Sequence, residues 1–197
     1  AQAIQDAADL VAYLNATSGP WADLRAANGH AAPYGVKLFN LGNEPWSPST
    51  QQVEYNFMTA TGAAAYAADS LEFIAAMKAV DPGIRVTLAA TSPRPNALAQ
   101  AVAWNQTLID TCGDQIAALV TNIYYDSTLP QQYGVKPVEG FIDGLIGQVT
   151  AFNSSHANQI EVIVGEHGNA IVPAFGNTDP DFAMQWQGAV TMADFLG

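Results

Sequence analysis

The hydrophobic positions along the chain follow two alternating patterns, one with helical spacing and one of short apolar runs. Apolar residues three or four positions apart predict five helices, at Ile4–Leu14, Ala64–Ile74, Leu98–Cys112, Ile142–Phe152 and Phe182–Ala193. Runs of strand length predict four strands, at Val36–Leu41, Ile84–Ala90, Leu119–Tyr125 and Ile160–Val164. Between the first helix and the first strand, Gly19-Pro20-Trp21 is followed by an expected loop through Asn28-Gly29-His30 and Pro33.

The order is therefore one helix followed by four repeats of strand and helix. Strands that alternate with amphipathic helices predict a parallel sheet, and strands that are apolar on both faces predict helices covering it. We expect residues 1–197 to form a single α/β domain or part of one. Two architectures suit this order equally: part of a (β/α)8 TIM-type barrel, which usually needs about 250 residues, or a small open doubly wound parallel sheet.

Composition narrows the classes of partner. The chain is 49% hydrophobic and 12% charged, which predicts a globular core. Its 18 acidic and 6 basic residues give a net charge of −12, and the basic residues are scattered, so we expect no nucleic-acid partner. No apolar run reaches the roughly eighteen residues of a membrane span. The start of the chain lacks a signal-peptide pattern; the acidic balance favours a secreted, processed protein, with a cytoplasmic location as the alternative.

A carboxylate follows the first predicted strand, in the sequence Leu41–Trp46. Glu44 comes directly after Asn43 and two residues before Trp46. Functional groups of parallel α/β folds gather where strands end, so this is a candidate active-site acid. The aromatic rings of Trp46 and Trp21 are candidate platforms for sugar rings.

Glu166 has a similar setting after the fourth predicted strand. Two carboxylates at strand ends are the minimum equipment for cleaving a glycosidic bond, and retention of configuration needs them about 5–5.5 Å apart. Candidate substrate-binding groups accompany them: Asn122 and Tyr124 near the end of the third strand, and His167 beside Glu166.

Other chemistries find no support in the sequence. There is no Gly-rich phosphate loop, no Gly-x-Ser-x-Gly elbow and no paired cysteine motif. The three histidines are far apart, so we expect no metal site and no cofactor. The single cysteine, Cys112, is expected to be a small apolar residue within a helix.

Three segments together resemble the clan A glycoside hydrolases, most closely the family 51 α-L-arabinofuranosidases. They are Trp21–His30, Pro33–Lys37 and Leu41–Trp46, and the preceding helix, Ala7–Asn15, also fits that family. The resemblance is most specific from about residue 5 to residue 46 and looser from there to Glu166.

The resemblance implies a (β/α)8 barrel enzyme that hydrolyses glycosides with retention, of which this chain would cover about strands four to seven. It also implies roles: Glu44 as acid/base, Glu166 as nucleophile and Asn43 as the group that binds the sugar 2-hydroxyl. The family usually has a histidine on the sixth strand, where this chain has Asn122-Ile123. The β-xylosidases and β-glucuronidases of the same clan remain alternatives.

The sequence therefore predicts a retaining exo-glycosidase resembling the α-L-arabinofuranosidases, acting on polysaccharide side chains and needing no cofactor. The alternative is a non-catalytic carbohydrate-binding or assembly protein derived from a glycosidase barrel. The expected partners are a carbohydrate and either further copies of the chain or barrel segments from a longer one.

Overall fold

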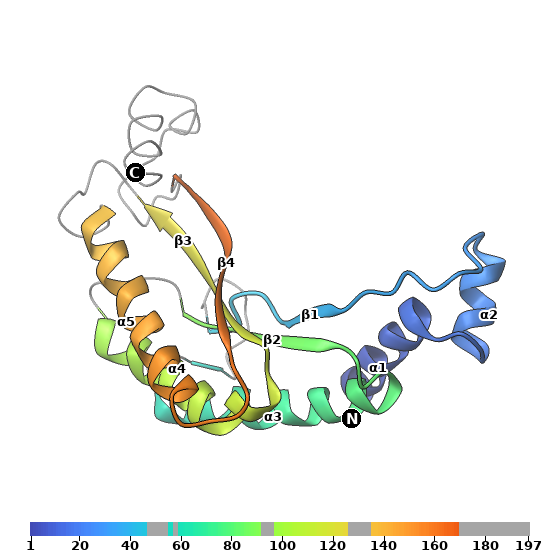
Figure 1. The fold of residues 1–197 in the computed structure, drawn as a ribbon, viewed down its shortest axis with the longest axis horizontal. Helices are drawn as coiled ribbons and strands as arrows, with labels where there is room; N and C mark the ends of the chain where they lie inside the picture. Colours follow the sequence, from blue (N-terminus) through green and yellow to red (C-terminus); the bar gives the residue numbers. More distant parts are fainter. Residues whose placement is uncertain (47–54, 57–58, 92–96, 126–134, 170–197) are drawn as a thin grey trace.

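The computed structural model describes residues 1–46, 55–56, 59–91, 97–125 and 135–169. Four strands form one parallel sheet in the order β1-β2-β3-β4 (Figure 1). The strands are β1 (Leu38–Leu41), β2 (Arg85–Ala89), β3 (Ala118–Tyr125) and β4 (Glu161–Asn169). The helices are α1 (Gln2–Asn15), α2 (Pro20–Ala27), α3 (Ala60–Val80), α4 (Leu98–Cys112) and α5 (Val135–Asn153), with a 3₁₀ turn at Gly113–Gln115.

The winding of the chain distinguishes the two predicted architectures. Each strand pairs in parallel with the next one in sequence, and α3, α4 and α5 lie in order along one side of the sheet (Figure 1). A doubly wound sheet reverses its strand order and carries helices on both faces. The prediction of such a sheet is therefore wrong for the described residues, and the winding is that of a partial barrel.

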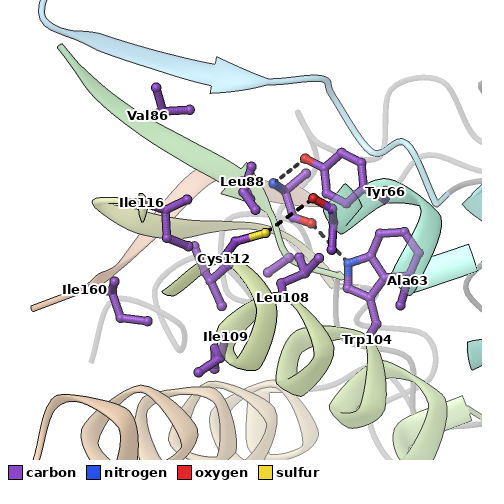
Figure 2. Close-up of a cluster of buried hydrophobic side chains, with 14 of the residues drawn as sticks. Ala63, Tyr66, Val86, Leu88, Trp104, Leu108, Ile109, Cys112, Ile116 and Ile160 are labelled. Carbon is purple, nitrogen blue, oxygen red and sulfur yellow. Dashed lines mark hydrogen bonds between the residues drawn. The ribbon is translucent and has the colours of Figure 1, made fainter. Parts of the chain in front are cut away.

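The core lies between the sheet and these helices. Val86 and Leu88 of β2 are fully buried against side chains of α3 and α4 (Figure 2). At the same interface the buried Tyr66 hydroxyl accepts a bond from the Ala89 N–H at 3.0 Å, and the Trp104 indole N–H donates to the Ala89 carbonyl at 3.2 Å. The polar atoms of both large side chains therefore have partners in an otherwise apolar core.

Cys112 also belongs to this core, as the sequence predicts. It lies at the end of α4, fully buried, with Sγ 3.5 Å from the Ala67 carbonyl oxygen (Figure 2). Burial raises the pKa of its thiol to about 11. The side chain therefore acts as a small apolar group.

Four of the five expected helices are confirmed, as α1, α3, α4 and α5, and the expected helix at Phe182–Ala193 lies outside the described residues. The expected loop through Asn28-Gly29-His30 and Pro33 is confirmed, and α2, which the pattern does not predict, precedes it. Gly19 enters that helix at φ 96°, and Pro20 occupies the first turn, where its missing N–H costs nothing. None of the described helices has the length and apolar character needed to cross a membrane.

The predicted end of the fourth strand at Val164 is wrong, because β4 continues to Asn169. Its register with β3 shifts by one residue: Thr121 pairs with Val164, but Asn122 pairs with Glu166. Gly165 is the extra residue of a β-bulge. The pairing with β3 extends the strand, and the sequence of β4 alone does not show that partner.

Candidate active site

Alternate residues of the four strands line a hollow on the sheet face opposite the helices. Its volume is about 320 Å³. The lining residues are Leu38, Asn40, Asn43, Thr87, Val120, Asn122, Ile163, Gly165 and Glu166. Three predicted site residues, Asn43, Asn122 and Glu166, thus border one space although they are distant in sequence.

Glu44 lies in the turn that follows β1. Gly42 has φ 80° and Glu44 has φ 46°, so this turn places a non-glycine residue in the left-handed region. That conformation costs about 1–2 kcal/mol for a residue with a Cβ. Oε1 of Glu44 accepts a hydrogen bond from Asn122 Nδ2 at 3.0 Å, across 78 positions of sequence.

Glu166 lies in β4 at the bulge. Side chains alternate between faces along a regular strand, so without the extra residue Glu166 would lie on the opposite face from Ile163. With it, Ile163, Gly165 and Glu166 all line the hollow. Because Asn122 pairs in register with Glu166 and donates to Glu44, one residue of β3 connects both predicted catalytic acids.

The structure argues against the predicted platform role of Trp46. The side chain is 2% exposed, and its indole N–H donates to the Ala90 carbonyl at 3.0 Å. Trp46 is therefore part of the core that fastens the turn after β1 to the end of β2. Trp21 belongs to α2, which lies at the opposite end of the molecule from the carboxyl ends of β3 and β4 (Figure 1).

The remaining predicted residues are placed differently. Asn122 is 7% exposed and lines the hollow. His167 follows Glu166 in β4 and is not among the lining residues, because alternation turns it to the other face. The backbone of Tyr124 pairs with Gly168, and its side chain lies outside what the structure describes.

Two polar residues of the hollow are absent from the sequence prediction. Asn40 Oδ1 accepts from the Thr87 hydroxyl at 2.9 Å, and Asn40 Nδ2 donates to the Gly42 carbonyl at 2.7 Å. These bonds tie β1 to β2 and shape the turn that carries Glu44. The available signal was a polar residue between apolar neighbours in the middle of each strand.

The charge of the site suits a neutral, hydroxyl-rich ligand. Glu166 is the one charged residue among the described lining residues, and Glu44 is bonded to that lining through Asn122. Amides and carboxylates bind sugar hydroxyls, whereas phosphates would be repelled. Among the residues described, no group of three or more His, Cys, Asp or Glu side chains could hold a metal ion.

Comparison with known sequences gives one family. Residues 1–123 match the family described as the alpha-L-arabinofuranosidase 1 domain. An exo-α-(1→6)-L-arabinofuranosidase of Bifidobacterium longum is 27% identical over 159 residues, which cover 75% of this chain and 28% of that protein. An intracellular exo-α-(1→5)-L-arabinofuranosidase of Bacillus subtilis is 29% identical, over 64% of this chain and 24% of that protein. The chain spans about a quarter of the length of these relatives.

Solved structures confirm the fold. A family 51 α-L-arabinofuranosidase from Bifidobacterium longum superposes with a TM-score of 0.71 at 19% identity, covering 95% of this chain and 37% of that one. The enzyme from Thermotoga maritima superposes with a TM-score of 0.66 at 21% identity, covering 84% of this chain and 32% of that one. The predicted partial (β/α)8 barrel is thus confirmed, and the chain spans about a third of these structures.

Proposed function

The chain belongs to the α-L-arabinofuranosidase 1 domain family, and from this premise we propose that it carries the catalytic acids of a retaining glycoside hydrolase. The main observation in support is the position of Asn122, which donates to Glu44 and pairs in register with Glu166. This arrangement joins the predicted acid/base and the predicted nucleophile through one residue beside a hollow lined by Asn43.

In the proposed reaction, the Glu166 carboxylate attacks the anomeric carbon. The bond to the leaving oxygen breaks, its electron pair stays on that oxygen, and Glu44 supplies the proton. The ionised Glu44 then takes a proton from water, which attacks the anomeric carbon and releases Glu166 from the glycosyl ester. Asn43 binds the sugar 2-hydroxyl, and no metal or organic cofactor takes part.

The proposed substrate is a terminal α-L-arabinofuranosyl residue of a polysaccharide side chain or oligosaccharide. Its support is that both curated relatives described above are exo-acting L-arabinofuranosidases by name. The Bacillus subtilis relative is also intracellular by name, which favours the cytoplasmic alternative over secretion. The missing parts of the barrel come, in this proposal, from the rest of a longer chain.

Hydrolysis of 4-nitrophenyl α-L-arabinofuranoside tests the proposal. We expect Glu44→Gln and Glu166→Gln each to lower kcat/KM by about a thousandfold or more, because each removes a group that acts on the reacting atoms. Proton NMR of the first-formed anomer should show retention. Glu161→Gln is the matched control, since Glu161 lies in the same strand, is 62% exposed and pairs with Arg85.

Two results would contradict the proposal. One is equal activity of wild type, Glu44→Gln and Glu166→Gln. The other is a wild-type chain that binds arabinose-containing oligosaccharides in calorimetry but cleaves none of them, which would favour the non-catalytic carbohydrate-binding alternative.

A further inference from the structure

The side-chain amide of Asn122 holds the carboxyl group of one predicted catalytic acid. Nδ2 donates to Oε1 of Glu44 at 3.0 Å, and the side chain is 7% exposed. A partly buried hydrogen bond between an amide and a carboxyl group restricts the orientation of both groups. The sequence suggested a sugar-binding role for Asn122, but this contact is with the enzyme's own acid.

The glycine at the bulge leaves the space in which this amide sits. A Cβ on Gly165 would lie 3.1 Å from Oδ1 of Asn122 and 2.6 Å from Cγ1 of Val120. Both distances are shorter than ordinary van der Waals contact, so any side chain here would displace the amide or the valine. Gly165 therefore turns Glu166 into the hollow and also makes room for Asn122.

The bond has a chemical consequence for the acid. An amide N–H donates to a carboxyl oxygen that carries no proton. While Asn122 holds Oε1, the proton of the acid form of Glu44 resides on Oε2. A general acid must present its proton within about 2.6–3.2 Å of the atom that receives it, so the choice of oxygen decides whether transfer is possible.

We propose that Asn122, seated in the space left by Gly165, is a positioning residue that holds Oε1 of Glu44 and directs the proton on Oε2 to the leaving group. This role rests on the proposed function of Glu44. Asn122 acts through Glu44 and does not itself touch the reacting atoms.

A double-mutant cycle tests the contact without relying on activity. Urea unfolding is measured for the wild-type chain, Asn122→Ala, Glu44→Ala and the double variant. We expect the two changes to be coupled by about tenfold in the unfolding constant, as for a partly buried hydrogen bond to a carboxyl group. A control cycle pairs Glu44→Ala with Asn158→Ala, whose amide donates to the Gly113 and Ile116 carbonyls, and should be additive. Additivity of Asn122 and Glu44 would overturn the proposal.

The dependence of rate on the leaving group tests the positioning role. A phenyl leaving group needs protonation far more than a 2,4-dinitrophenyl group does. We expect Asn122→Ala to lower kcat/KM for the phenyl arabinofuranoside at least tenfold more than for the dinitrophenyl one, because general acids contribute about 10²–10⁴ in rate. Asn158→Ala should affect both substrates alike. Equal losses for Asn122→Ala would mean a merely structural role and would overturn the proposal.

Replacing the glycine tests how the amide is seated. In a Gly165→Ala background the coupling between Asn122 and Glu44 should fall from about tenfold to less than about fivefold in the unfolding constant. Gly147→Ala on α5 is the control, because a Cβ there meets nothing within 4 Å. Full coupling in Gly165→Ala would overturn the seating role. A wild-type chain that cleaves neither glycoside would overturn the proposed function, and the cycle would still decide the positioning contact.

Discussion

At the scale of single residues, a buried arginine joins the first two helices. Arg25 of α2 is 1% exposed, and its guanidinium donates to four backbone carbonyls at 2.7–3.1 Å. The acceptors are Tyr13, Ala16, His30 and Ala31. The guanidinium presents several N–H donors in a rigid planar fork, which suits donation to four carbonyls at once. Lysine has fewer donors, all on one nitrogen, and would not replace it.

We predict that Arg25→Met will destabilise the chain by about 2–4 kcal/mol. The change keeps an apolar stem but leaves four partly buried carbonyl bonds without their donor. A lower midpoint in urea unfolding would measure the loss. Arg85→Met is the matched control and should change stability by less than about 1 kcal/mol, since Arg85 is 54% exposed and its ion pair with Glu161 is screened by water. Equal losses would show that the four carbonyl bonds contribute nothing.

Some roles at the site can be predicted from local sequence, whereas others depend on how the strands pair. Asn43 and Glu166 could be assigned to one hollow from the sequence, because strand ends and local motifs identify them. Trp46 could not be assigned, since an indole suits a sugar platform and a core equally, and its partner, Ala90, belongs to another strand. The bond between Asn122 and Glu44 depends on the registers of three strands, which no local pattern contains.

At the scale of elements, periodicity located the helices that cover the sheet because each has an apolar face to bury. It did not predict α2, because the helix has little apolar pattern: its only fully buried large side chain among the described residues is the polar Arg25. It also ended β4 too early. Gly165, Glu166 and His167 carry no strand pattern, and their extended conformation comes from pairing with β3.

An acidic residue at the end of α3 connects that helix to two other segments. Asp81 accepts hydrogen bonds from Lys37 Nζ at 2.9 Å, from Asn15 Nδ2 at 2.9 Å and from the Gly83 N–H at 2.8 Å. The bond from Lys37, followed by that from the Gly83 N–H, lowers the pKa of this carboxyl below its ordinary value of 3.8.

We predict that Asp81→Asn will lower stability at pH 7 by about 1 kcal/mol, a modest loss because Lys37 is exposed and water screens the pair. A carboxyl whose pKa is lower in the folded state stabilises the fold above its unfolded pKa. That contribution disappears as the pH falls through the folded value. The difference between wild type and Asp81→Asn in urea unfolding should therefore shrink as the pH falls below the ordinary carboxyl pKa of 3.8. A pH-independent difference for Asp81→Asn would contradict this prediction.

At the scale of the whole molecule, the described sheet ends in two outer strands. Within the described residues, β1 pairs only with β2 and β4 only with β3. Leu38 of β1 faces the hollow and is 49% exposed, a position that a closed barrel would cover. Unpaired strand edges beside exposed apolar side chains favour association with further chains.

We predict that the isolated 197-residue chain will associate. Its weight-average mass in sedimentation velocity should exceed 20.7 kDa and rise with protein concentration. The net charge of −12 opposes this association, so added salt should strengthen it by screening the repulsion.

Leu38→Lys should shift the population toward monomer, because lysine on an outer strand disfavours edge-to-edge pairing. Leu10→Lys is its control: Leu10 is similarly exposed, at 50%, but lies on helix α1 and not on a strand, so this variant should associate like the wild type. A chain that stays monomeric at every concentration would mean that β1 and β4 are covered by other parts of the same chain. Equal effects of the two lysines would instead attribute the association to general hydrophobicity and not to the strand edge.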